Sequence, residues 1–391
     1  TLRYLDNRGE RDMALPPSHD FEWTPTTRDD HVGGKYPHVN VLDTVFVETV
    51  GGDLTVKVEN NTETGLGIHS EPVEDRSQSL TDAEISYARR GLLIRLRVRP
   101  SRERTTRYLV YDPRSQAVER IDAIGGSCVQ LPEDHGIIFP GGYYLQSGEN
   151  KRFDLPADMV AGLRFKRMVK SPNGEDVLYV FYQPGSGHYA LFTYNLINKT
   201  LSTPILANGY ARFPDGRVLV FQVDRGEPTR VHPMQLWQTP FVSEEHASAQ
   251  PAVKGFLGKI GNPELVRGVS DLMGIARAVR EQLPTRVAYD DLIRQCTRVL
   301  DAYFWLDDPQ AGGLASLLRG IAEGARGTLA EFEKVDGIRK ETARALAQAE
   351  AEQHALMTDI ASTLWRKSDD FVKALGRLRE RRGRLQLVRE L

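Results

Sequence analysis

The sequence contains one segment twice, at an offset of 83 residues from Tyr111 to Tyr194. Tyr111-Asp112 in RYLVYDPRSQAVERI aligns with Tyr194-Asn195 in YALFTYNLINKTLSTPI, and Val118 then aligns with Leu201. After each copy comes a turn with a proline and another apolar run, LPEDHGIIF and FPDGRVLVF respectively. Two units of roughly 41 residues fit this offset, and propeller blades have about that length. The repeat therefore predicts a β-propeller-like domain.

Residues 1–245 are predicted to be rich in short strands. Val41–Val47 and Leu54–Val58 are runs of β-branched residues, and Gly51-Gly52-Asp53 between them is a hairpin signal. Turn residues recur between the later apolar runs, for example at Pro172-Asn173-Gly174. Such spacing is typical of a sandwich, a barrel or a propeller, and the repeat favours the propeller. At roughly 41 residues per blade this region holds about six units, and an incomplete or irregular ring is one form of the prediction.

The period of the apolar residues changes after residue 245. Residues 246–262 are predicted to be a linker and residues 263–391 a helical, coiled-coil domain. Asn262-Pro263-Glu264 offers a capping side chain, a proline at the first helical position and an acid in the first turn. Four more helices are predicted from the 3–4 spacing, over about residues 292–304, 314–334, 338–367 and 368–391. The near-heptad stripe of the 338–367 helix suits a bundle or the start of a coiled coil.

Composition excludes several classes of protein. Of the 391 residues 40% are hydrophobic and 27% charged, as in soluble globular proteins. The first residues, TLRYLDNRGERD, lack the apolar core of a signal peptide, and no apolar run approaches the roughly 18–20 residues that span a bilayer. Two cysteines, Cys128 and Cys296, give no disulfide framework and suit a reducing cytosol, which predicts a cytoplasmic protein. The net charge of −2 does not argue for a polycationic nucleic-acid binder.

No motif in the sequence specifies a reaction. There is no G-x-x-x-x-G-K-[ST] loop, and the nearest run, Gly255–Lys259, lacks both the spacing and the Ser or Thr that would bind magnesium. H-E-x-x-H, C-x-x-C and G-x-S-x-G are also missing. The chain is therefore expected to have no catalytic residues, no cofactor and no ATPase activity of its own.

An arginine-rich stretch is the first candidate contact surface. It runs from Arg89 to Arg114, with only Glu103 and Asp112 as acids. Alternate residues of a strand share one face, and a face of arginines can hold phosphates, nucleic acid or an acidic partner by forked hydrogen bonds. The favoured alternative is a solvated strand face paired with acids of a neighbouring strand. The candidate contacts in this stretch are Arg95, Arg97, Arg99, Arg102 and Arg104.

The last helix is the second candidate surface, because it is strongly basic. A basic helix can lie on nucleic acid, which makes Arg381, Arg382 and Arg384 candidate contacts. The exposed face of a coiled coil is the favoured alternative. In the preceding helical region, Gly320, Gly324 and Gly327 indicate either close helix packing or a locally weak helix.

Histidines gather near the start of the chain. His19, His31 and His38 accompany Asp20, Asp29 and Asp30 in SHDFEWTPTTRDDHVGGKYPH. Mixed histidine and carboxylate ligands bind metals, so a propeller hydrolase or metal enzyme is one hypothesis. The favoured alternative is a set of turn residues whose side chains bond to the backbone.

Several long strings resemble a bacterial family of DNA repair ATPases: YLDNRGERD, PPSHDFEW, FVETVGGDLTVKVENNTETG, DHGIIFPGGYYLQSGE, SPNGEDVLYVFY and EPTRVHPMQLWQTPF. The resemblance covers most of residues 1–245 and continues more loosely through IGNPELVRGVSDL and AYDDLIRQCTRVLDAYFWL. It implies a very large protein with a β-rich amino-terminal region, long helical and coiled-coil segments, and an AAA-type ATPase domain near the carboxyl end. ATP and magnesium would bind only in that domain, whose motifs this chain lacks.

The resemblance implies that this chain is a non-catalytic scaffold or recognition region of an AAA-type motor. Its expected partners are the rest of its own polypeptide or an AAA-type ATPase, with DNA or an acidic protein as further candidates and no membrane. The missing initiator Met and a helical pattern that continues to Leu391 fit a piece of a longer polypeptide. The alternatives are direct nucleic-acid binding through the two arginine sets and, with least support, the histidine enzyme.

Overall fold

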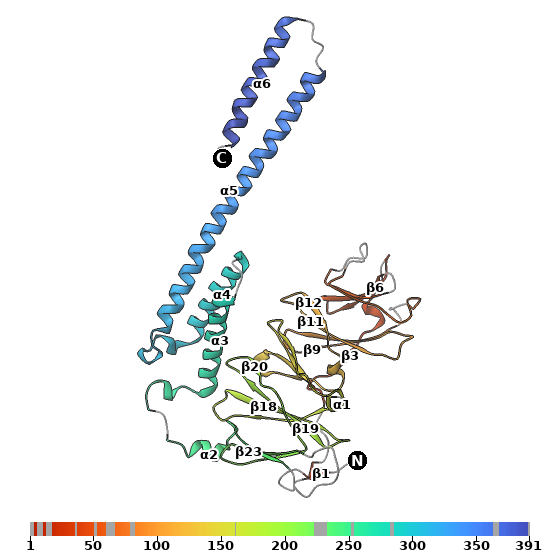
Figure 1. Ribbon diagram of the computed structural model, residues 1–391, viewed down its shortest axis with the longest axis vertical. Coiled ribbons are helices and arrows are strands. Elements are labelled where there is room, and N and C mark those ends of the chain that lie inside the picture. Colours follow the sequence, from red (N-terminus) through yellow and green to blue (C-terminus); the bar gives the residue numbers. More distant parts are fainter. Residues whose placement is uncertain are drawn as a thin grey trace. The chain divides into compact units, whose positions relative to one another are not determined.

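The chain divides into a β-rich unit and a helical unit (Figure 1). The computed structural model describes residues 4–5, 11–12, 18–35, 37–50, 53–59, 67–78, 83–160, 162–222, 233–251, 254–281, 285–362 and 367–389. The first unit comprises residues 1–254 and 260–270, and the second comprises residues 255–259 and 271–391. The predicted order, strands first and helices after, is confirmed.

In the described part of the first unit, strands close in sequence pair into five antiparallel sheets, and the pair β1 (Tyr4–Leu5) and β2 (Arg11–Asp12) is separate from them. The first sheet holds β4 (His31–Val32), β5 (His38–Val41), β6 (Val45–Val50), β7 (Asp53–Lys57) and β8 (His69–Glu71). The second holds β3 (Thr24–Pro25), β9 (Glu84–Arg89), β10 (Ile94–Arg99), β11 (Arg107–Asp112) and β12 (Ala117–Arg120).

Three further sheets complete the series. The third holds β13 (Val129–Gln130), β14 (Gly136–Phe139), β15 (Gly142–Leu145) and β16 (Asn150–Arg152). The fourth holds β17 (Arg164–Lys170), β18 (Asp176–Gln183), β19 (His188–Asn195), β20 (Thr200–Leu201) and β21 (Ile205–Ala207). The fifth holds β22 (Gly209–Arg212), β23 (Arg217–Phe221) and β24 (Met234–Gln238).

The sequence repeat corresponds to equivalent hairpins two sheets apart. Tyr111 pairs with Val118 between β11 and β12, and Tyr194 pairs with Leu201 between β19 and β20. In each hairpin the residue after the tyrosine closes the turn through its side chain. Asp112 Oδ1 accepts from the backbone N–H of Arg114 at 2.9 Å, and Asn195 Oδ1 accepts from that of Asn198 at 2.8 Å. The third sheet follows the first copy and precedes the second along the chain, so the 83-residue offset spans two successive sheets.

Successive sheets pack face to face, and period-two alternation explains how. On β18, Val177, Tyr179 and Phe181 enter the core between the third and fourth sheets. Leu178 and Val180, pointing the other way, enter the core between the fourth and fifth sheets. A strand buried on both faces needs apolar residues at every position, which is why VLYVF is continuous rather than alternating.

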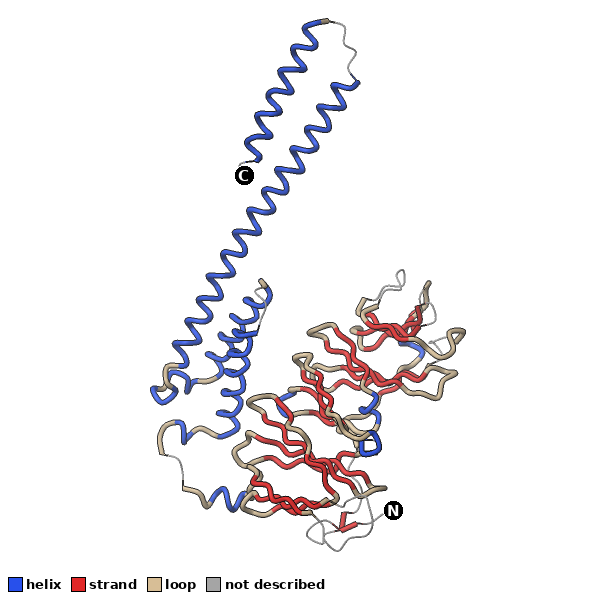
Figure 2. The backbone as a smooth tube through the Cα atoms, viewed as in Figure 1, coloured by secondary structure: helices blue, strands red, loops and turns tan. Residues whose placement is uncertain are grey.

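The same alternation builds the other two cores. Between the first and second sheets, valines and leucines of β5 to β7 meet Ile94, Leu96 and Val98 of β10. Between the second and third sheets, Val110 of β11 meets Ile137 and Phe139 of β14. The result is an ordered stack of sheets with filled interfaces (Figure 2). The described strands do not form a closed propeller ring.

A segment near the start of the chain, Ser18–Pro25, joins the second and third sheets. Its end forms β3, which pairs with β9 at the edge of the second sheet. Its beginning bridges in parallel to Cys128, next to β13 of the third sheet. There the carbonyl oxygen of Ser18 accepts from the backbone N–H of Cys128 at 2.9 Å and from Ser127 Oγ at 2.7 Å. We call this segment the N-terminal strap.

The helical unit is built on α4 and α5. Helix α3 (Asn262–Glu281) runs from the first unit into the second, and α4 (Arg286–Ala302) begins at Thr285, whose hydroxyl caps the N–H of Ala288 at 3.2 Å. Leu292, Cys296 and Val299 form the buried face of α4. The buried residues at the start of α5 (Leu314–Ser362) are Ala315, Leu318, Ala322 and Ala325. Because three of them are alanines, α4 and α5 can pack closely.

One predicted boundary is wrong: the helices expected over residues 314–334 and 338–367 are one 49-residue helix, α5. Gly337 lies between the two predicted ranges. An interior glycine costs only about 1 kcal/mol relative to alanine and keeps its backbone N–H, unlike proline. The helix therefore continues through it. Helix α6 (Ser368–Arg389) then runs antiparallel beside the distal half of α5 (Figure 1).

Replacing Gly324 by alanine is expected to stabilise α5 by about 1 kcal/mol, because alanine has the lower conformational entropy cost in a helix. A Cβ at this position would meet no atom within 4 Å. The midpoint of thermal unfolding, followed by circular dichroism, should rise. Gly312→Ala is the opposite control, since Gly312 has a φ of 66° and a side chain there is strained. Equal effects of the two substitutions would contradict this account.

Short elements complete the described structure. They are α1 (Ala157–Val160), α2 (Glu244–Ser248) and 3-10 helices at Arg28–Asp30, Asp122–Gly125, Pro132–Asp134, Leu257–Lys259, Phe304–Asp307 and Pro309–Ala311. Among the described residues, no helix is both long enough and apolar enough to cross a lipid bilayer.

Candidate functional site: the arginine row and the helical hairpin

The arginine row on β10 lies on one face of its strand, as predicted. Ile94, Leu96 and Val98 point from β10 into the core beneath the first sheet. The intervening arginines therefore point to the opposite face, where the N-terminal strap crosses. Phe21 and Trp23 of the strap lie under Arg95 and Arg97, with guanidinium-to-ring distances of 4.7 Å and 5.5 Å.

Arg95 is fully buried in this face. Its exposed fraction is 0%, and Nη2 donates to Gln130 Oε1 of the third sheet at 2.6 Å. Nε and Nη1 have no hydrogen-bond partner among the described residues. The guanidinium also lies near the buried thiol of Cys128, whose pKa is raised to about 11 chiefly by burial. Arg95 thus joins the second sheet to the third and does not face solvent.

The rest of the row becomes more exposed along the strand. Arg97 is half-buried and donates to Ser86 Oγ at 3.1 Å. Arg99 is exposed and lies 3.5 Å from Glu84 on the neighbouring strand. The favoured alternative, acids on a neighbouring strand, thus describes Arg99, while Arg95 and Arg97 pack on aromatic rings. The structure does not bring the three guanidinium groups to one solvent-facing surface.

The loop after β10 holds the other two strand candidates. Arg102 is exposed and donates to Asp75 Oδ2 at 2.9 Å. Hydrogen bonds from Ser77 and then from Arg102 lower the pKa of Asp75 to about 2. Arg104 is exposed. These two arginines and Arg99 are the exposed members of the five candidates in this stretch.

A buried ion network lies beside this loop, and the sequence did not reveal it. Arg107 Nη1 donates to Glu103 Oε2 at 2.5 Å, while its Nε lies 3.3 Å from Glu71 Oε2 without hydrogen-bond geometry. Burial opposes the ionisation of Glu103 most strongly. Hydrogen bonds from Arg107 and from the backbone N–H of Glu74 outweigh it and lower the pKa of Glu103. Arg120 adds a second cation, 2.6 Å from Glu71.

This network connects two sheets, because Glu71 ends the first sheet while Arg107 and Arg120 belong to the second. In the sequence, Glu103 and Arg107 simply belong to the arginine-rich stretch. Nothing in the local pattern distinguished a buried pair from a solvated one.

The three candidate arginines on α6 also differ in how far they are exposed to solvent. Arg381 is mostly buried, lies 2.5 Å from Glu352 and also donates to the carbonyl oxygen of Ala349 on α5. Arg384 is exposed and paired within its own helix to Glu380 at 2.7 Å. Arg382 is exposed. Together with the pair formed by Arg377 and Asp359 at 2.5 Å, Arg381 fastens α6 to α5 as a helical hairpin.

Among the described residues, none of the three N-terminal histidines belongs to a cluster of possible metal ligands. His19 belongs to the strap, where its Nε2 lies 2.7 Å from the carbonyl oxygen of Ile124 and its ring packs on Phe21. His38 is buried against Phe46 of β6, and His31 is half-buried on β4. The described residues contain no group of three or more His, Cys, Asp or Glu side chains placed to hold a metal ion.

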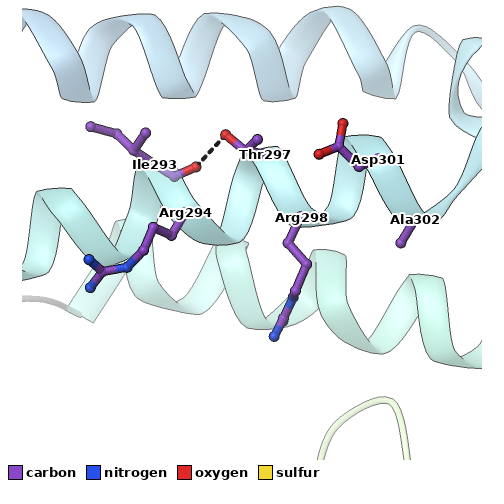
Figure 3. Close-up of a pocket in the computed structure, with 6 residues that line it drawn as sticks. All are labelled: Ile293, Arg294, Thr297, Arg298, Asp301 and Ala302. Carbon is purple, nitrogen blue, oxygen red and sulfur yellow. Dashed lines mark hydrogen bonds between the residues drawn. The ribbon is translucent and has the colours of Figure 1, made fainter.

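A shallow open cleft of about 600 Å³ lies along α4 (Figure 3). Its two cations, Arg294 and Arg298, point the same way from the helix. Arg294 donates to Asp291, and Arg298 lies 3.8 Å from Asp271. Because both guanidinium groups have carboxylate partners, the charge of the cleft is balanced. It is lined by Ile293, Arg294, Thr297, Arg298, Asp301 and Ala302.

The comparisons with known proteins decide the family. A family model described as "ATPase involved in DNA repair" matches residues 1–304, which is the whole sheet stack together with α3 and α4. The chain belongs to this family of ATPases involved in DNA repair. The resemblance stated from the sequence strings is thereby confirmed. No curated protein matches the chain.

Within this DNA repair ATPase family member, the interface between the third and fourth sheets contains a pH-sensitive histidine. His135 Nδ1 lies 2.8 Å from the hydroxyl of Tyr194, and burial followed by the nearby Lys199 lowers the pKa of His135 to about 4. The unfolded chain protonates this residue near its ordinary pKa of about 6.5, so the folded state loses stability as pH falls from there towards 4.

The free energy of unfolding of this family member is therefore expected to drop by about 2 kcal/mol from His135 alone between pH 7.5 and 5. Urea unfolding at the two pH values measures the drop. His135→Gln, which does not titrate and keeps a hydrogen-bonding side chain, should show a correspondingly smaller loss. If both proteins lose the same stability, His135 is not the group responsible.

Proposed function

We propose that this chain is the non-catalytic scaffold and recognition region of a large AAA-type DNA repair ATPase. Its sheets form a propeller-like but incomplete stack that binds a partner protein or nucleic acid. Its helical hairpin is the root of a coiled coil that couples the stack to the ATPase. The same proposal places the protein in the cytoplasm, with ATP and magnesium bound only by an ATPase domain outside this chain.

The observation that carries the proposal is the joining of a filled sheet stack to a long helical hairpin. Four apolar cores occupy the spaces between successive sheets. Sheet edges and loops are then the surfaces left for recognition, as in other stacked architectures. The hairpin is held by paired charges along α5 and α6, so it can act as a continuous lever rather than as two independent helices.

The coupling is tested in a polypeptide that carries both this chain and the AAA-type ATPase domain. Leu356 of α5 is buried, whereas its neighbour Met357 is 54% exposed. Leu356→Asp should loosen the hairpin, leave basal ATP turnover unchanged and reduce the turnover stimulated by DNA at least several-fold. Met357→Asp is the matched control and should leave both rates unchanged. Equal stimulation in the wild type and Leu356→Asp would refute coupling through the hairpin.

Direct nucleic-acid binding is the second candidate, and the exposed arginines favour it. Arg99, Arg102, Arg104, Arg382 and Arg384 are exposed on the β10 loop region and on α6. If all five contacted phosphates of duplex DNA, the logarithm of affinity would fall with the logarithm of salt at a slope of about −4 to −5. Arg95 and Arg381 are engaged inside the protein and contribute nothing to this slope in the structure described.

Fluorescence anisotropy with a short labelled duplex measures this slope directly. Arg104→Glu combined with Arg382→Glu should weaken binding by at least tenfold at low salt. Arg217→Glu is the control, because Arg217 is an exposed arginine outside both sets. No binding by the wild type at low salt would remove this candidate and leave a protein partner.

A further inference from the structure

The helical hairpin of α5 and α6 buries few side chains. Among the described side chains of residues 342–362 and 368–386, the buried ones are Ala349 and Leu356, exposed by 4% and 9%. Helices in water take most of their stability from packing an amphipathic face, so two helices joined in this way gain little from each other. The facing residues, which we call the seam, are Thr342, Ala345, Ala349, Glu352 and Leu356 of α5 and Ala374, Leu378, Arg381 and Leu385 of α6.

The side chains next to the seam fall on two flanks of the hairpin. A helix turns by about 100° per residue, so the residues just before and just after a seam residue lie on opposite sides of the helix. Because α5 and α6 are right-handed and antiparallel, the residues that follow seam residues share one flank in both helices. We call this the open flank. It consists of Ala343, Leu346, Glu350, Gln353 and Met357 of α5 and Leu375, Arg379, Arg382 and Gln386 of α6.

The opposite flank is closed by ion pairs. Arg377 reaches across to Asp359 of α5 at 2.5 Å, and Arg384 lies 2.7 Å from Glu380. None of the residues that precede seam residues is a large apolar one. The charges of these two arginines are therefore balanced within the hairpin, and this flank offers nothing apolar for a further helix to cover.

The open flank combines exposed apolar side chains with cations. The exposed fractions are 53% for Leu346, 54% for Met357 and 50% for Leu375. Arg379 and Arg382 are exposed beside them, and neither forms an ion pair with a described residue. Apolar groups and unneutralised charge thus lie side by side on one surface.

Arg339 extends this surface towards the start of α5. It lies two turns before Leu346 on the same side of the helix, is exposed, and has no ion pair in the described part of the chain. Glu350 is the acid among the described residues of the open flank. Arg339, Arg379 and Arg382 are therefore set against one carboxylate, and the surface is net positive.

The charge of the open flank decides which occupant fits. A second copy of the hairpin would bring the same arginines against one another, which costs free energy. Duplex DNA would satisfy the arginines through its phosphates but would gain nothing from the leucines and the methionine. A helix with apolar residues at a spacing of three and four, and with acids beside them, matches both features.

We propose that the open flank binds an acidic amphipathic helix of a partner protein, which forms a three-helix bundle with α5 and α6. Its apolar stripe packs on Leu346, Met357 and Leu375, and its carboxylates pair with Arg379 and Arg382. From Arg339 to Met357 the flank extends over about 27 Å, which is the length of a helix of about 18 residues. The binding needs no ATPase domain, so it stands or falls independently of the proposed coupling.

Fluorescence anisotropy on the full chain tests this proposal. The probe is a labelled synthetic peptide of that length, with leucines at a spacing of three and four and glutamates beside them. The wild type should bind it saturably at low salt. Arg382→Glu should weaken binding by about tenfold and should strengthen binding of a second peptide in which lysines replace the glutamates.

The matched control is Arg384→Glu, because Arg384 is an exposed arginine on the closed flank of the same helix. It should leave the affinity for the acidic peptide unchanged. Leu375→Ser removes an apolar contact without changing charge and should also weaken binding. Circular dichroism checks that the helix content of the three variants equals that of the wild type.

Three outcomes overturn the proposal. One is no saturable binding of the acidic peptide by the wild type while a labelled DNA duplex binds, which would make the open flank a nucleic-acid surface. Another is equal weakening by Arg382→Glu and Arg384→Glu, which would show only general attraction to a basic hairpin. The last is a wild-type dimer by light scattering that Leu375→Ser converts to a monomer, because a second copy would then cover the flank.

Discussion

Arg107→Leu is expected to lower the free energy of unfolding of the sheet stack by about 3–5 kcal/mol, the cost of breaking a buried ion pair from one side. The side chain of Glu103 is 0% exposed, and Arg107 supplies its nearest cation at 2.5 Å. Without Arg107, Glu103 keeps hydrogen bonds from the Glu74 backbone at 2.6 Å and from Gln78 at 3.0 Å but loses its counter-charge. Urea unfolding followed by tryptophan fluorescence measures the loss.

The matched control for this prediction is Arg102→Leu. Arg102 is also paired to a carboxylate at 2.9 Å, yet its side chain is 59% exposed. Exposed pairs contribute about 0–1 kcal/mol, so this substitution should change the unfolding free energy by less than 1 kcal/mol. Adding Glu103→Gln to Arg107→Leu should recover part of the loss, since the two residues share one interaction. A loss no greater for Arg107→Leu than for Arg102→Leu would show that the network is not buried as described.

Arg95→Ala is expected to cost about 3 kcal/mol, through a cavity between the second and third sheets and an unpaired Gln130 carbonyl. Arg95→Met should cost much less, because it keeps most of the volume packed on Phe21 and removes a cation with two unpaired nitrogens. The same unfolding experiment compares the two. Arg99→Ala, on the same face but exposed, should stay within about 0.5 kcal/mol of the wild type.

The comparison separates packing from charge at Arg95. If Arg95→Met destabilises the protein as much as Arg95→Ala, the positive charge itself holds the sheets together. If Arg99→Ala lowers the free energy of unfolding as much as Arg95→Ala does, then burial does not decrease from Arg95 to Arg99 as described. In the DNA-binding assay neither Arg95 variant should change affinity while the protein remains folded, since the guanidinium of Arg95 lies inside the stack.

The strand architecture could be predicted because its signals are local. The tyrosine and the Asp or Asn that follows it mark the same hairpin in two sheets, and Val50 pairs with Asp53 around the predicted glycine turn, whose residues 51–52 lie outside the described part. Helix α5 shows the limit of such signals. Gly337 lies between the two predicted helices, yet it is inside α5, because glycine weakens a helix without excluding helical geometry.

The burial of Arg95 and Arg97 could not be predicted, because the aromatic residues that cover them lie more than 70 positions earlier in the chain. Phe21 and Trp23 alternate with polar residues in the strap, a period-two signal that the sequence analysis does not use. Likewise, the partners of Arg107 come from β8 and from the loop after β10. Burial of a charge is decided by tertiary contacts, and one sequence does not show which distant segment supplies them.

We propose that this chain recognises a partner and couples that binding to an ATPase domain but does not itself hydrolyse ATP. Isothermal titration of purified chain with magnesium and ATP, together with a phosphate-release assay, tests this proposal. We predict no saturable heat of binding and no phosphate release above the protein-free rate, whereas a polypeptide that also contains the AAA-type ATPase domain should turn ATP over. Stoichiometric binding or turnover of ATP by this chain alone would contradict the claim.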